Sequence, residues 1–411
     1  MSLAELPMVF VLLGLVFYIV LAGADFGAGI WQLAPGAGEH GERVRDHAHD
    51  AMAPVWEANH VWLIFVLTVT WTAYPAAFGS LASTLSVALF LAGLGIIVRG
   101  AAYALRSGTS EPREIRRIDT ASAVSSIVTP FALGAAIGGL ASGRVPYGNA
   151  KGDLVTSWLN PTSILIGALA VVFCAYLAAV YLCADAVRRD EPALVAPFRA
   201  RALAAGSVAG VLSIGGLPVL HNDAHPLYHE LVAGSGLPAV VISVLAGLGT
   251  FGLVARGRFE PARYTAAAAV AAIVAGWALA QEPRFLPGLT IEQAAAPHDV
   301  LVAIVVAVVG GAIILFPSLV LLFRLTLGGH LGHGHEQVAW SPGPRRDLVL
   351  AAAPGLLGRA AAACLVAGFG LLTVAEAGWA HGLGVVALFG FIVVGFAGAV
   401  PALLDGEAGG G

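Results

Sequence analysis

Residues 6–34 read LPMVFVLLGLVFYIVLAGADFGAGIWQLA, and Asp25 is the only charged side chain among these 29 residues. A helix needs ~20 consecutive apolar residues to cross a bilayer, so this segment predicts a transmembrane helix. A cleaved secretory signal has a basic start and a shorter apolar run. The first basic residue is Arg43, so we expect the segment to stay in the protein.

Ten further stretches are apolar and long enough, or nearly so, to span a bilayer. They cover residues 54–74, 80–105, 119–141, 161–186, 202–220, 237–255, 263–281, 299–325, 358–377 and 383–404. Over all 411 residues, 58% are hydrophobic and only 11% are charged, whereas soluble domains carry ~25% charged residues. The sequence therefore predicts an all-α polytopic membrane protein and excludes a string of soluble domains.

The composition also excludes other classes of protein. The net charge is −4 and there is no basic block, so we expect no binding to nucleic acid. Cys174, Cys183 and Cys364 lie in apolar segments, without the spacing of a disulfide framework or a metal motif. We therefore expect no metal site from the cysteines.

The basic residues predict how the chain is oriented in the membrane. Loops on the cytoplasmic side carry an excess of Lys and Arg. If the N-terminus lies outside, 18 of the 21 basic residues fall on the inside, and Arg144, Lys151 and Arg284 remain outside. The predicted orientation is therefore N-out and C-in.

Polar residues within the apolar segments are the candidate functional residues, because a charge at the bilayer centre costs at least ~2.5–3.5 kcal/mol. Asp25 lies between Gly23, Gly27 and Gly29, which let another helix or a cofactor approach the backbone closely. The orientation puts Asp25 in the inner third of the membrane. It either has a function there or reaches the water of the headgroup region.

A second polar group stands at the inner start of the next span, where Trp56, Glu57, Asn59, His60 and Trp62 follow one another closely. Glu57 near a helix N-terminus is favoured by the helix dipole, so it is either a capping residue or part of a polar cluster that faces protein. The two tryptophans either belong to an interfacial belt or flank that cluster.

Arg99 lies near the inner end of residues 80–105. It either extends to the membrane surface or pairs with Asp25 or Glu57, since the orientation puts all three at a similar depth. Buried carboxylates near an arginine can hold or relay protons.

Three other polar patterns are weaker. Asp119, Ser122, Ser125, Ser126 and Thr129 share one helical face, which either lines a wet path or bonds its own backbone. His221, His225 and His229 recur every four residues and form a possible metal face on the outside, interrupted by Pro226. His330, His333 and His335 cluster in a Gly-rich loop.

Several strings together resemble subunit II of the cytochrome bd-type quinol oxidases. They are ADFGAG at 24–29, PVWEANHVWLI at 54–64 and WTAYPAAF at 71–78, with Arg99 and Asn160-Pro161. The resemblance covers residues 1–326. It implies nine spans, arranged as two four-helix bundles plus a peripheral helix.

The resemblance also implies a function and partners. Such a chain is the non-haem subunit of a quinol:oxygen oxidoreductase in the bacterial or archaeal cytoplasmic (inner) membrane. It forms a heterodimer with subunit I, which binds haem b and haem d, while quinol and dioxygen are the substrates and lipids surround the complex. No catalytic residue is then expected in this chain, and a structural quinone or lipid remains open. Alternatives are a proton-coupled secondary transporter and a purely structural assembly subunit.

By the same resemblance, Asp25 and Glu57 are carboxylates of a proton path, with Asn59, His60 and Arg99 as further candidates. Trp56 and Trp62 are candidates for an oxygen route. Glu57 stands where the family often has Asp, and His60 stands where it often has Gln.

Residues beyond 326 depart from the family pattern. We expect a His/Gly/Pro-rich cytoplasmic loop at 327–357, two additional transmembrane helices within 358–404, and a short tail at 405–411.

Overall fold

The structure is a computed structural model that describes residues 2–33, 38–106, 112–327, 356–373 and 378–405. Within these ranges it does not describe the side chains at 40, 49–50, 52–58, 106, 112, 316, 319–327 and parts of the last two helices. The chain divides into two units, Met1–Ser318 and Leu319–Gly411.

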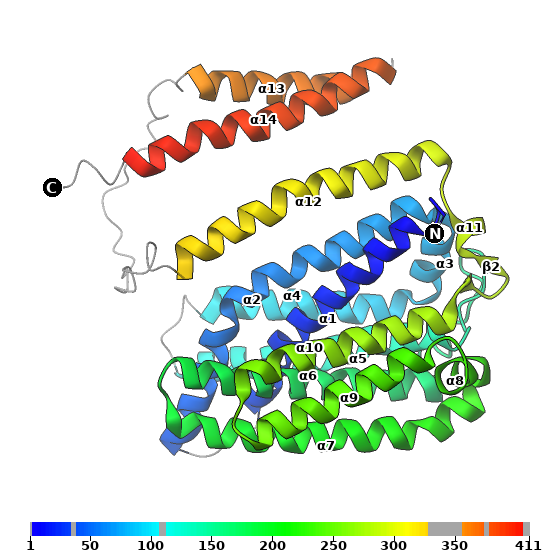
Figure 1. Cartoon of the computed structure of the whole chain (residues 1–411), viewed down its shortest axis with the longest axis vertical. Helices are drawn as coiled ribbons and strands as arrows, with labels where there is room; N and C mark the ends of the chain where they lie inside the picture. Colours follow the sequence, from blue (N-terminus) through cyan, green and yellow to red (C-terminus); the bar gives the residue numbers. More distant parts are fainter. Residues whose placement is uncertain (1, 34–37, 107–111, 328–355, 374–377, 406–411) are drawn as a thin grey trace. The chain divides into compact units, whose positions relative to one another are not determined.

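Helices account for nearly all of the described chain (Figure 1). They are α1 (Leu6–Leu33), α2 (Gly38–Ala73), α3 (Pro75–Thr84), α4 (Ser86–Arg106), α5 (Pro112–Ala141), α6 (Pro161–Arg188), α7 (Pro192–Asp223), α8 (His225–Val232), α9 (Leu237–Ala255), α10 (Phe259–Gln281), α11 (Ile291–Ala294), α12 (His298–Leu327), α13 (Leu356–Thr373) and α14 (Gly378–Asp405). A short antiparallel pair, β1 (Arg284–Leu286) and β2 (Leu289–Thr290), precedes α11. In the second unit, α13 packs against α14.

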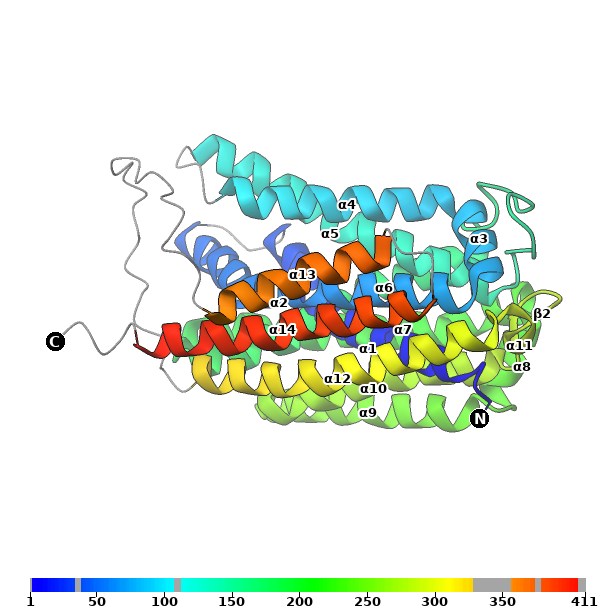
Figure 2. The same cartoon turned by 90° about the horizontal axis from the view of Figure 1, so that it is seen from above.

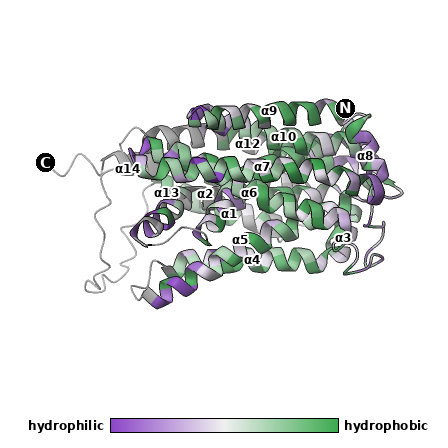
Figure 3. Ribbon diagram, turned by 90° about the horizontal axis from the view of Figure 1, so that it is seen from below, coloured by the Kyte–Doolittle hydropathy of each residue, from purple (hydrophilic) through white to green (hydrophobic). Residues whose placement is uncertain are grey.

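The prediction of an all-α membrane protein is confirmed. Among the described residues, eight helices are long and apolar enough to cross a membrane, and Asn59–Ala73, Leu356–Gly368 and Gly382–Val394 are shorter apolar helices. In the first unit, hydrophobic residues follow the length of the helices, while hydrophilic residues gather at their ends (Figure 3). The number of spans and the N-out orientation stay predictions.

Several segments between the expected spans are helical. Residues 35–53 belong to α2 from Gly38 onward, residues 75–79 open α3, and residues 221–236 contain α8. Hydropathy marks only the part of a helix that is apolar, whereas Glu, Arg and Ala continue a helix into water. Proline also fits the first turn of a helix, so Pro75 starts α3 directly after α2 ends.

The long helices of the first unit form two groups of four, as predicted. One group contains α1, α2, α4 and α5, the other contains α6, α7, α9 and α10, and α1 packs against α6 between them (Figures 1 and 2). The peripheral helix is α12, which joins the core near its start through Leu301 and Ile304.

Two glycines allow α1 and α6 to pack closely. A Cβ atom on Gly27 would overlap the carbonyl of Cys174, and one on Gly23 would lie 2.9 Å from the Leu177 side chain. The glycines therefore admit another helix, which is one of the two uses expected from the sequence.

We expect Gly27→Ala to lower the thermal stability of the purified protein in detergent, because overpacking costs typically ~1–3 kcal/mol. The matched control is Gly210→Ala in α7, where an added Cβ has no heavy atom within 4 Å. That variant should be neutral or stabilised by up to ~1 kcal/mol. Equal melting temperatures for the two variants would contradict this account of the α1–α6 contact.

Candidate functional site

Asp25 of α1 and Arg99 of α4 form a buried ion pair. Nη2 of Arg99 donates to Oδ1 of Asp25 at 2.5 Å, and Nε donates to Oδ2 at 3.1 Å. The exposed fraction is 0% for the Asp25 side chain and 2% for Arg99. The readings in which Asp25 reaches headgroup water, or Arg99 extends to the surface, are therefore wrong.

Side chains from two more helices complete the hydrogen bonding of this pair. Asn59 of α2 donates its amide to Oδ2 of Asp25 at 3.3 Å, and the hydroxyl of Tyr103 on α4 donates to Oδ1 at 3.3 Å. Arg99 also donates from Nη1 to the hydroxyl of Ser126 on α5 at 2.5 Å. We call Asp25, Asn59, Arg99, Tyr103, Ser122 and Ser126 the Asp25–Arg99 cluster. Each carboxylate oxygen of Asp25 thus has two donors.

The local sequence explains how a guanidinium fits among four packed helices. A Cβ atom on Gly29 would lie 2.5 Å from Nη1 of Arg99, so only glycine leaves room there. The rings of Phe26 and Tyr103 each lie with their centroids 5.4 Å from the guanidinium carbon. Such contacts stabilise a cation by roughly 0.5–2 kcal/mol, more when it is desolvated.

The hydroxyl stripe of α5 serves two purposes. Ser125 and Ser126 each donate to the carbonyl of Ser122 at 2.7 Å, which is the backbone bonding weighed from the sequence. The hydroxyls of Ser126 and, at 3.4 Å, Ser122 also accept from Arg99. The hydroxyl of Thr129 is buried and has no hydrogen-bond partner among the described residues.

The other site residues expected from the sequence are only partly described. Trp62 is half-buried and stacks on Phe17 with ring centroids 4.5 Å apart, so it fills the α1–α2 interface. His60 is half-buried on α2. Trp56 and Glu57 lie outside the residues whose side chains are described.

Sequence reasoning missed Tyr103 and the buried His47. Nε2 of His47 lies 3.3 Å from the carbonyl oxygen of Leu182 and 3.8 Å from Oδ2 of Asp185, and Nδ1 lies 3.6 Å from Oε2 of Glu191. Because residues 35–53 lie between the first two expected spans, no buried histidine was predicted there. The sequence signal that could have indicated a buried face is the apolar pair Val44 and Ala48, which are four residues apart and therefore share a helical face. Both are fully buried in the structure.

His221, His225 and His229 do not form the metal face that was considered. The rings of His221 and His225 lie 5.1 Å apart, and His221 contacts the ring of Tyr228 at 5.0 Å. Within the described part of the chain, no group of three or more His, Cys, Asp or Glu residues is placed to hold a metal ion. His330, His333 and His335, like most of the loop at 327–357 and the tail at 405–411, lie outside the described residues.

Comparisons with known proteins agree with this architecture. Residues 3–326 match the family model described as cytochrome bd terminal oxidase subunit II. The structure of bd oxidase from Geobacillus thermodenitrificans superposes with a TM-score of 0.62 at 25% identity, covering 80% of this chain and 99% of that one.

Two characterised relatives are similar over shorter stretches. Cytochrome bd ubiquinol oxidase subunit 2 of Bacillus subtilis (strain 168) is 26% identical over 174 residues, which cover 42% of this chain and 51% of the relative. Cytochrome bd-I ubiquinol oxidase subunit 2 of Escherichia coli (strain K12) is 28% identical over 175 residues, 41% of this chain and 45% of the relative. The chain thus spans about half the length of these relatives in the alignments. Since the family model covers most of its residues, the chain belongs to the cytochrome bd terminal oxidase subunit II family.

Proposed function

We propose that this chain is the non-haem subunit of a bd-type terminal oxidase, a complex that oxidises quinol and reduces dioxygen to water. The family match over residues 3–326 supports this proposal, as does the named activity of the Bacillus and Escherichia relatives. In this proposal the chain forms a heterodimer with haem-bearing subunit I in the cytoplasmic membrane. Family membership also speaks against a secondary transporter.

Haem b and haem d are assigned to subunit I, as the family resemblance implies, and three candidate ligands in this chain already have other contacts. Axial ligands of haem iron are commonly His, Met or Cys. Cys174 packs against the glycines of α1, Cys183 donates to the carbonyl of Val195 at 3.4 Å, and His47 lies among two carboxylates and a backbone carbonyl.

The observation that carries a role in proton access is the burial of the Asp25–Arg99 cluster among α1, α2, α4 and α5. Charged side chains inside a membrane are rare and mark ion or proton pathways. Arg99 compensates the charge of Asp25, and both carboxylate oxygens already accept hydrogen bonds. We therefore assign Asp25, Asn59 and Arg99 a structural role, which is to fix the buried polar contacts between the helices. Glu57 and His60, on the same helix as Asn59, are then the groups that exchange protons.

Dioxygen is apolar and would diffuse between helices rich in small residues. Trp56 and Trp62 are the candidates beside this route. Trp62 stacks on Phe17 and packs edge-on against Phe65, with the Trp62 and Phe65 ring centroids 6.0 Å apart. These three rings form an apolar surface on the same helix as Asn59 and on α1.

A purely structural role is the second candidate, and one observation favours it. Each oxygen of Asp25 already has two donors, so the pair is complete without a mobile proton. The two readings differ in whether removing a carboxylate changes the rate of turnover or only the yield of the complex.

We expect Glu57→Gln to slow quinol-driven oxygen uptake by the purified complex roughly 10-fold or more, since positioned proton-transfer groups typically contribute ~10²–10⁴-fold. Asp25→Asn should slow it less but lower the yield of the complex, because it leaves the buried Arg99 without its counter-charge. The haem content per assembled complex should stay intact in both variants. The control is Asp190→Asn, which changes an exposed carboxylate. Normal turnover per haem in both variants, with reduced yield, would support the structural role instead.

A further inference from the structure

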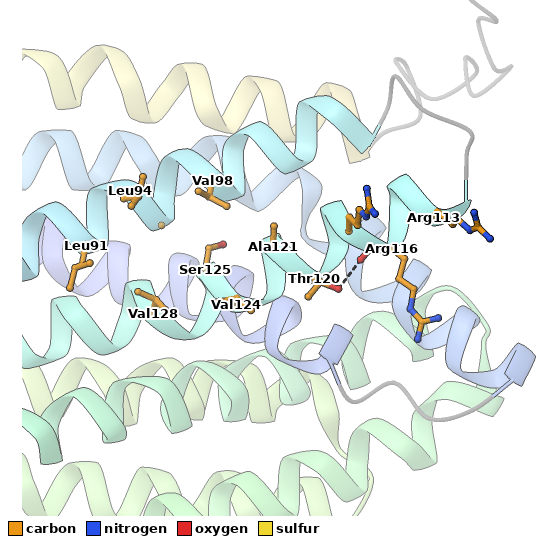
Figure 4. Close-up of a pocket in the computed structure, with 12 residues that line it drawn as sticks. Leu91, Leu94, Val98, Arg113, Arg116, Thr120, Ala121, Val124, Ser125 and Val128 are labelled. Carbon is orange, nitrogen blue, oxygen red and sulfur yellow. Dashed lines mark hydrogen bonds between the residues drawn. The ribbon is translucent and has the colours of Figure 1, made fainter.

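A groove of about 830 Å³ runs between α4 and α5. Its apolar part is lined by Leu91, Leu94 and Val98 of α4 and by Val124 and Val128 of α5 (Figure 4). Leu94, Val124 and Val128 keep exposed fractions of 47%, 51% and 38%. This part of the groove is therefore an exposed apolar surface that runs along two helices.

One end of the groove is strongly basic. Arg113, Arg116 and Arg117 line it from the first turns of α5, where positions three and four residues apart share a helix face. Figure 4 labels Arg113 and Arg116 at this end. All three side chains are exposed, and no carboxylate of the described residues forms an ion pair with any of them. The hydroxyl of Thr120, also at this end, donates to the carbonyl of Arg116 at 2.7 Å.

The predicted orientation puts this basic end at the cytoplasmic surface, where anionic lipids are found. A ligand that fits must combine a negative headgroup with a long apolar tail parallel to the helices. A quinone has the tail but no charge to match three guanidiniums. A helix of another protein could fill the apolar part, but it would also need several carboxylates to pair with the three arginines.

We propose that this groove binds one anionic phospholipid. Its phosphate contacts Arg113, Arg116 and Arg117, and an acyl chain lies along Leu94, Val98 and Val124. Basic pockets between membrane helices bind anionic headgroups in this way. The proposal does not depend on the oxidase activity, because lipid retention is measured without turnover.

The test uses the full complex purified in detergent and mixed with equal amounts of phosphatidylglycerol and phosphatidylcholine. Retained lipids are counted by native mass spectrometry. Three arginines near an anionic headgroup are expected to favour phosphatidylglycerol on the order of 100-fold. The variant Arg113→Gln/Arg116→Gln/Arg117→Gln should lose this preference. The matched control Arg43→Gln/Arg256→Gln/Arg258→Gln removes three exposed charges, predicted to lie on the same side, and should keep it.

A photoactivatable phosphatidylglycerol should label peptides containing residues 91–98 or 120–128 in the original chain. If the triple groove variant does not assemble, Val124→Trp fills the apolar part without changing charge and should also reduce retention. Equal phosphatidylglycerol retention in groove and control variants would overturn the proposal. So would a quinone recovered from the groove, or cross-linking of the groove to subunit I with no lipid retained.

Discussion

Arg99→Ala is expected to destabilise the protein by about 3–5 kcal/mol, the usual cost of removing one partner from a buried ion pair. The Asp25 carboxylate would then be left at 0% exposure with only the donors of Asn59 and Tyr103. Most of the cost comes from this uncompensated charge. The variant should accumulate poorly in membranes, and any purified protein should unfold at a much lower temperature.

A double variant separates the charge effect from the loss of packing. Asp25→Asn/Arg99→Gln removes both charges and keeps polar side chains of similar size, so it should recover much of the stability. Arg256→Gln is the control for loss of an exposed arginine on the same predicted side. If Arg99→Ala unfolds at the same temperature as Arg256→Gln, the pair does not hold α1 against α4.

The partnership of Asp25 and Arg99 was foreseeable from the sequence. Charge in the loops oriented the spans, the spans put both residues at one depth, and a buried charge needs a partner. That reasoning also offered Glu57 as a partner for Arg99, and only the structure distinguishes the two, through the bonds at 2.5 and 3.1 Å to Asp25.

The rest of the cluster was beyond sequence reasoning for a physical reason. Tyr103 and Ser126 belong to the cluster because α4 and α5 pack at a particular rotation about their axes, and hydropathy carries little information about that rotation when both faces are apolar. The N-terminal end of α2 was also not predicted, because the helix continues through charged residues after Gly38, where hydropathy gives no signal. His47 was overlooked as a consequence.

The largest expected effect concerns the whole complex. If this chain is the non-haem subunit, an affinity tag on it should bring a haem-bearing partner out of the membrane, and the chain separated from that partner should be colourless. The chain is expected to be colourless because the resemblance assigns the haems to subunit I, and the side chains of Cys174, Cys183 and His47 already pack or form hydrogen bonds within this chain. Quinol added to the intact complex should drive oxygen uptake.

A reduced-minus-oxidised visible spectrum of the complex, purified through a tag on this chain, tests the proposed function most directly. The account predicts bands of both b-type and d-type haem, in constant ratio to this chain, and their loss when the partner is removed. A chain that purifies stably, alone and without haem, from membranes that contain active bd-type oxidase would contradict it.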